Sequence, residues 1–128
     1  MGELLAIAAG GAIGACLRFA VSLLASSAQW HGALGTALAN VLGSFLLGLL
    51  AGHVESEAAH PLLRPFLTVG VFGSFTTFSA LAADNRALAF ESGEASALLQ
   101  LAATLALGLA AFALGTVLDA RWRPRGPA

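Results

Sequence analysis

The stretch GVFGSFTTFSAL, residues 70 to 81, places polar and helix-weakening residues inside an otherwise apolar segment. Gly70 and Gly73 weaken a helix, and the hydroxyl residues that follow compete with backbone hydrogen bonds. Irregular backbone at membrane depth is tolerated where it is buried in protein or lines a cavity. Exposed carbonyls suit a cation, and exposed N–H groups suit an anion. The stretch therefore predicts a helix break, a close helix contact or a path for a polar species.

Two further polar side chains lie within apolar segments. Arg18 can snorkel to the lipid headgroups, or it can place a fixed positive charge at an aqueous vestibule and attract anions. Asn40 can join two helices, or its amide N–H can replace water around an anion in a pore. Thr36 lies four residues before Asn40, so the two side chains share a helix face and could line one track.

Aromatic residues and the distribution of charge narrow the possible chemistry. Phe72, Phe75 and Phe78 recur every three positions, and aromatic ring edges are partly positive, so a small anion can pass along them; ordinary packing is the alternative. No acid, lysine or histidine lies in the middle of an apolar segment, which leaves proton-coupled transport without a carrier. The sequence shows no catalytic triad, nucleotide loop or Cys/His cluster, so we do not expect an enzyme.

The elements that hold these residues are apolar enough to lie in a membrane. The chain of 128 residues is 58% hydrophobic and only 10% charged, whereas a soluble domain averages about 25% charged. Four segments reach the length of about 20 residues that a spanning helix needs, at approximately 4–25, 33–52, 62–83 and 95–118. We predict one all-α membrane domain over residues 1–128, without a nucleic-acid partner.

Four helices make a thin bundle, so a transport path needs a second copy. Small residues recur at helical spacing, as in GGAIG, and such faces let helices approach closely. Four spans place both termini on one side, where Arg64, Arg121, Arg123 and Arg125 also fall, against Arg86 on the other side. Most of this bias comes from the C-terminal tail, which leaves room for insertion in both orientations.

The stretches GGAIGACLRF, GTALANVLGSFLLG and GVFGSFTTFSAL resemble, in order and spacing, the signature stretches of the small fluoride channels, the Fluc or CrcB family. The resemblance covers essentially the whole chain. It implies a fluoride-selective channel for passive efflux, and so fluoride resistance, in a bacterial plasma membrane. It also implies an antiparallel dimer of dual-topology subunits, with two narrow pores and a break in the third helix.

The same resemblance implies roles by motif position. Backbone carbonyls of Gly73 and Thr76 are expected to hold a structural Na⁺ at the dimer centre. The family's pore asparagine matches Asn40, and its vestibule arginine matches Arg18.

Further pathway residues follow from the same motifs. The first aromatic of the family's phenylalanine pair matches Phe78, and the serine after it matches Ser79. Hydroxyl residues of the family's polar track match Thr36 and, in the last span, Thr104. The family often has Glu at the end of the third span, where this chain has Asp84.

The chain departs from the family pattern after Ser79. The common run is TTFSTF, whereas here Ala80 and Leu81 replace the threonine and the second phenylalanine. Leu81 can hold the steric place in the fluoride pathway, or a non-identical partner subunit can supply the missing ring. The partner is therefore a second copy of the chain or a paired, different subunit. Because Leu81→Phe restores the common pattern, the sequence predicts that this change is tolerated.

Two other functions fit four short spans. A small multidrug-type proton-coupled exporter has the same size, but it needs a carboxylate inside the first span, and Glu3 lies too near the terminus. A non-transporting membrane scaffold would use only the small-residue faces.

Overall fold

The computed structural model describes residues 1–28, 32–56 and 59–122, and this part of the chain is helical without a strand. Arg123 and Arg125, which contribute to the orientation bias, lie outside the described residues. The elements in chain order are α1 (Gly2–Ser27), α2 (Gly32–Val54), η1 (Pro65–Phe72), α3 (Gly73–Phe75), α4 (Phe78–Ser92) and α5 (Glu94–Trp122).

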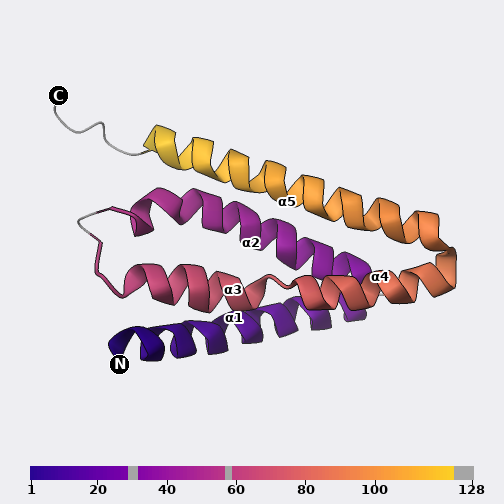
Figure 1. Cartoon of the computed structure of the whole chain (residues 1–128), viewed down its shortest axis with the longest axis horizontal. Coiled ribbons are helices and arrows are strands. Elements are labelled where there is room, and N and C mark those ends of the chain that lie inside the picture. Colours follow the sequence, from indigo (N-terminus) through magenta and orange to yellow (C-terminus); the bar gives the residue numbers. More distant parts are fainter. Residues whose placement is uncertain (29–31, 57–58, 123–128) are drawn as a thin grey trace.

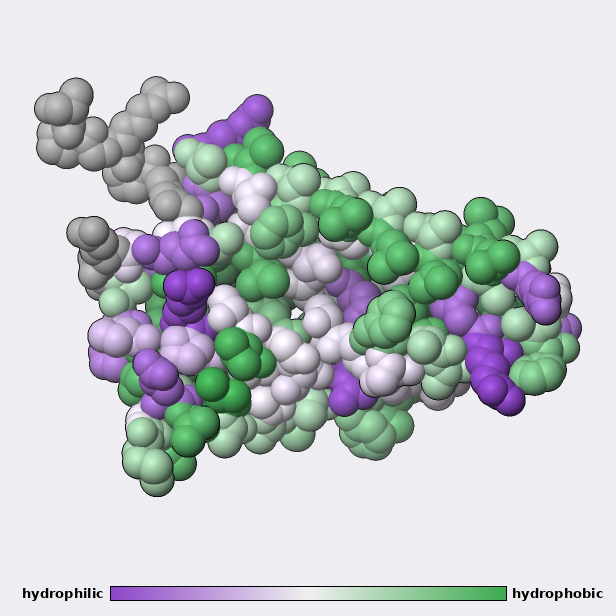
Figure 2. Space-filling view, in the orientation of Figure 1, coloured by the Kyte–Doolittle hydropathy of each residue, from purple (hydrophilic) through white to green (hydrophobic). Residues whose placement is uncertain are grey.

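Four helical runs in the described chain are long and apolar enough to cross a membrane. They are Gly2–Ser27, Ala33–Val54, Pro65–Ser92 and Glu94–Trp122. Figure 2 shows apolar side chains along the length of the bundle and most of the hydrophilic ones towards its two ends, with a few near the middle. The predicted all-α fold with four candidate spans is confirmed, and the chain is a multi-pass membrane protein.

The third run, Pro65–Ser92, extends farther than the span predicted from the sequence. The predicted span ends near residue 83, but the helix α4 continues to Ser92 and only Gly93 separates it from α5. The helix is longer than the predicted span because its polar residues find partners within the bundle. The amide of Asn85 donates to the Leu81 carbonyl and to Gln100. Gly93 ends the helix with φ of 90°, a conformation that favours glycine.

The helices pack in two principal pairs. α2 lies along α5, while α1 lies along η1 and α3, and α4 continues against α5. In Figure 1 the third run passes between α1 and the pair formed by α2 and α5, and the start of α1 and the end of α5 lie at the same end of the bundle. The third run is therefore enclosed on two sides, which fixes the position of its polar stretch.

Glycines bring the backbones of each pair into direct contact. A Cβ added at Gly14 of α1 would collide with the Val71 carbonyl of η1. One added at Gly48 of α2 would collide with the Phe112 carbonyl of α5. Close approach of this kind strengthens packing in a membrane, where the hydrophobic effect does not drive helices together. The close helix contacts predicted from the small-residue spacing are confirmed at these positions.

We expect Gly14→Ala to lower the free energy of unfolding by about 1 to 3 kcal/mol, because the methyl group must displace backbone. Gly11→Ala is the matched control, since its Cβ would meet only the Ser74 hydroxyl, at 3.3 Å. Thermal unfolding of both variants in detergent measures the difference. Equal midpoints for the two would contradict the packing described above.

Candidate ion pathway

Helical hydrogen bonding stops at Thr76 and Thr77, within the third run. Thr76 has φ −80° and ψ 151°, and Thr77 has φ −153° and ψ 121°, so both residues are extended. In a continuous helix each N–H bonds to the carbonyl four residues earlier. The extended Thr76–Thr77 junction moves these N–H groups and carbonyls apart. The carbonyls before the junction and the N–H groups after it therefore need other hydrogen-bond partners.

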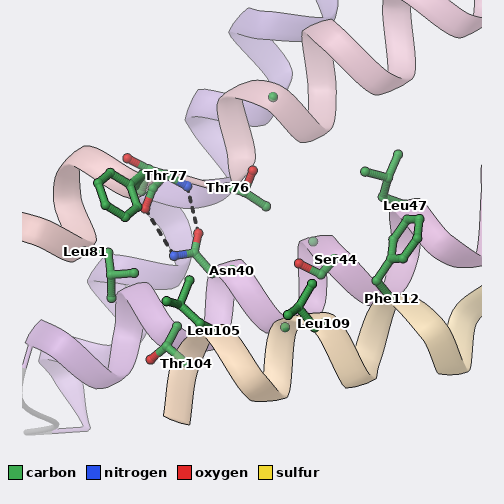
Figure 3. A pocket seen from close by; sticks show the side chains of 14 residues that line it. Asn40, Ser44, Leu47, Thr76, Thr77, Leu81, Thr104, Leu105, Leu109 and Phe112 are labelled. Carbon is green, nitrogen blue, oxygen red and sulfur yellow. Dashed lines mark hydrogen bonds between the residues drawn. The ribbon is translucent and has the colours of Figure 1, made fainter. Parts of the chain in front are cut away.

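Asn40 of α2 supplies both kinds of partner to Thr77. Its Oδ1 accepts the Thr77 backbone N–H at 2.7 Å, and its Nδ2 donates to the Thr77 carbonyl at 3.1 Å (Figure 3). A continuous helix would give that N–H to the Gly73 carbonyl, which here loses its helical donor. Asn40 thus joins α2 to the junction, as one of its two predicted roles requires, and keeps a second amide N–H.

Thr77 caps the helix that follows. Its Oγ1 accepts the Ala80 N–H at 3.2 Å, which a continuous helix would direct to the Thr76 carbonyl. The Ser79 hydroxyl lies 3.0 Å from the same Oγ1. The cap starts α4 and leaves the Thr76 carbonyl, like that of Gly73, without its helical donor.

Arg18 of α1 reaches the same region from the opposite side. Its Nε donates to the Ser74 carbonyl at 3.1 Å, in a half-buried position. That carbonyl would accept the Phe78 N–H in a continuous helix. The bond uses one of the five N–H donors of the guanidinium. Arg18 therefore does more than reach towards the headgroups, because it stabilises a carbonyl at the junction.

An open groove of about 500 Å³ runs between α2, the junction and α5. Figure 3 shows Asn40 and Thr76 on one side of it, with Leu105 and Leu109 of α5 facing them. Six of the residues expected at an ion site line this groove, namely Asn40, Gly73, Thr76, Phe78, Leu81 and Thr104. The fold thus brings together residues from three separate helices at the point where the backbone is extended.

Three other expected residues do not line the groove. The Thr36 hydroxyl donates to Asp84 Oδ2, which joins α2 to α4. Ser79 is exposed beside Thr77, and Arg18 lies on the α1 side of the junction. A single track formed by Thr36 and Asn40 is therefore absent from the groove lining, and the roles of these three residues in an ion pathway stay predictions.

The aromatic position and its leucine neighbour differ in exposure. The Phe78 side chain is 70% exposed at the edge of the groove, whereas Leu81 is 2% exposed. The Phe78 ring is available to a second molecule or an ion. Leu81 fills space inside the subunit, so a larger side chain at this position meets packed neighbours.

Sequence reasoning missed two polar clusters. Gln100 donates to the Ala33 carbonyl at 2.9 Å and accepts from Asn85, whose Oδ1 is buried without a partner among the described residues. Near the other end of α5, Asp119 is 3% exposed, and its Oδ2 accepts the Gly52 N–H at 3.2 Å. Its Oδ1 lies 2.8 Å from His53 Nδ1, within hydrogen-bond distance. The signal in each case is a polar residue near the end of an apolar run, to which the sequence analysis gave no contact.

Burial of Leu81 reverses the expectation that Leu81→Phe is tolerated. We expect the change to lower the free energy of unfolding by about 1 to 3 kcal/mol, because the larger ring overpacks a filled site. Leu98→Phe on the exposed face of α5, where the side chain is 66% exposed, is the control. Thermal unfolding in detergent decides the matter, and a Leu81→Phe variant as stable as the control would restore the original expectation.

Comparisons with known proteins agree with the resemblance of the three stretches. The family model described as "CrcB-like protein, Camphor Resistance (CrcB)" matches residues 5–116. "Fluoride-specific ion channel FluC 2" of Thermobifida fusca is 48% identical, over 91% of this chain and 90% of its own length. "Fluoride-specific ion channel FluC" of Aeromonas salmonicida is 43% identical, over 89% and 93%. The protein of that name from Anaeromyxobacter dehalogenans is 41% identical, over 95% and 98%. This chain belongs to the CrcB-like family.

Proposed function

We propose that this chain is a subunit of a passive, fluoride-selective channel, and that fluoride passes along the groove beside the Thr76–Thr77 junction. The relatives named as fluoride-specific ion channels match nearly the full length of the chain. The observation that carries the proposal is the placement of Asn40. It lines the groove beside the exposed Phe78, with an amide N–H that no residue in the described part of the chain accepts.

The chemistry of fluoride suits this arrangement. Fluoride is small and strongly hydrated, so a channel must replace its water with close hydrogen-bond donors. The Asn40 N–H and the partly positive edge of the Phe78 ring supply such groups. An inward-negative membrane potential expels an anion by about 2.3 kcal/mol per charge per 100 mV. A passive path therefore suffices for resistance and needs no fuel.

The groove also supports assembly with a second copy. Its lining contains the Thr76–Thr77 backbone and the Asn40 amide, and polar backbone cannot face hydrocarbon without cost. A second copy that covers the groove would bury these groups and the Phe78 ring. Following the family resemblance, we propose an antiparallel dual-topology homodimer, with the extended junction as the break in the third helix. A non-identical partner subunit is the alternative.

A structural Na⁺ at the dimer centre fits the open carbonyls. Gly73 and Thr76 both line the groove. The Gly73 carbonyl loses its helical donor because Asn40 accepts the Thr77 N–H, and the Thr76 carbonyl loses its donor because Thr77 Oγ1 accepts the Ala80 N–H. Carbonyl oxygens are hard ligands, and the described residues contain no group of three or more His, Cys, Asp or Glu that could hold a metal. Two copies of this pair would supply four oxygens to one ion.

We expect Phe78→Ile to abolish most fluoride flux while the dimer stays intact, because the isoleucine keeps bulk without a polarised ring edge. Efflux from liposomes with a K⁺ shunt, read by a fluoride electrode beside a chloride control, measures this. Wild-type protein should release fluoride and retain chloride. Wild-type rates from the purified variant would remove Phe78 from the pathway, and chloride release by wild-type protein would contradict selectivity.

A further inference from the structure

The hydroxyl groups that line the groove differ in whether their hydrogen is already used. Thr76 Oγ1 donates to the Phe72 carbonyl at 2.8 Å, and Thr104 Oγ1 donates to the Gln100 carbonyl at 2.8 Å. Thr77 Oγ1 lies in the pair with Ser79 and caps α4. Each of these hydroxyls must break or rearrange an existing bond before it can donate to an ion.

Ser44 of α2 is the exception among the hydroxyl residues of the groove. It lines the groove in a half-buried position, and its hydroxyl makes no hydrogen bond to any residue in the described part of the chain. Helical serines and threonines elsewhere commonly donate to the carbonyl four residues earlier, as Ser22, Ser26, Thr68 and Ser96 do. The Ser44 hydrogen is thus available without loss of a bond.

Ser44 also lies where it can act together with Asn40. The two residues are four positions apart on α2 and therefore face the same side of the helix, as Figure 3 shows. The residue opposite on α5 is Gly108, where an added Cβ would lie 3.5 Å from Ser44 Oγ. The glycine leaves space beside the hydroxyl.

We propose that Ser44 binds the permeating anion directly, and that its hydroxyl and the second N–H of Asn40 are successive donors along the groove. This inference rests on the proposed function and specifies its site. A strongly hydrated anion needs several donors to offset the loss of water, and charge-assisted hydrogen bonds are the stronger ones. The hydroxyls of Thr104 and Thr76 then keep their bonds within their own helices and do not bind the anion.

Fluoride efflux from liposomes tests the inference with wild-type protein and the variants Ser44→Ala and Ser44→Thr. Ser96→Ala, at an exposed serine that bonds back to its own helix, is the control. We expect Ser44→Ala to lower the rate per dimer about tenfold or more, as the loss of a hydrogen bond to a charged group predicts. Ser44→Thr, which keeps the hydroxyl, should stay much closer to the wild-type rate, and Ser96→Ala should match it.

The fluoride concentration that half-saturates the flux separates binding from a structural role. It should rise in Ser44→Ala, whereas a structural role would lower the yield of dimer and leave that concentration unchanged. A conducting wild-type protein with an unchanged Ser44→Ala variant would overturn the inference alone. A folded wild-type dimer without fluoride flux would overturn the proposed function, and this inference with it. If Ser44→Ala does not assemble, Ser44→Cys takes its place, because the thiol keeps the size of the side chain but is only a weak donor. An assembled Ser44→Cys dimer with an unchanged half-saturating concentration would show that the role of Ser44 is structural and would overturn the inference.

Discussion

Backbone groups at the Thr76–Thr77 junction must find hydrogen-bond partners in a medium without water, and the rest of the structure depends on how they do so. Side chains replace the helix at three points: Asn40 accepts the Thr77 N–H, Thr77 Oγ1 accepts the Ala80 N–H, and Arg18 donates to the Ser74 carbonyl. An unpaired backbone group in hydrocarbon costs several kcal/mol. The extended residues are therefore stable only while α1 and α2 stay in register with the third run.

This exchange of partners connects packing to chemistry. Glycine contacts bring α1 against η1 and α2 against α5, which sets the distances that Arg18 and Asn40 must span. Because side-chain oxygens take two of the N–H groups, the carbonyls of two residues that line the groove, Gly73 and Thr76, lack their helical donors. The same asparagine that stabilises the junction keeps an N–H for a ligand. Carbonyl oxygens, which are acceptors, and an amide N–H, which is a donor, thus lie close together. This placement suits a cation at the carbonyls and an anion along α2.

Local properties of the sequence predicted most of the fold. Hydropathy identified four spans, and helix-weakening residues identified the stretch that contains the junction. Partners across helices were harder to predict, because they depend on the rotation of each helix about its axis. Thr36 therefore contacts Asp84 and not the groove, and Leu81 is buried beside an exposed Phe78. The continuation of α4 beyond residue 83 depends in the same way on a partner from another helix, because Asn85 donates to Gln100 of α5.

Backbone amide exchange at Thr77 in the detergent-solubilised protein tests the central claim most directly. The N–H is held by Asn40 at 2.7 Å, so it should exchange slowly in wild-type protein although its backbone is extended. Asn40→Ala should raise the exchange rate at Thr77 about tenfold or more, as the loss of a half-buried hydrogen bond predicts, and leave amides in the middle of α5 unchanged. Fast exchange at Thr77 in the wild-type protein, or equal rates in both proteins, would contradict the role of Asn40 as the partner of the junction.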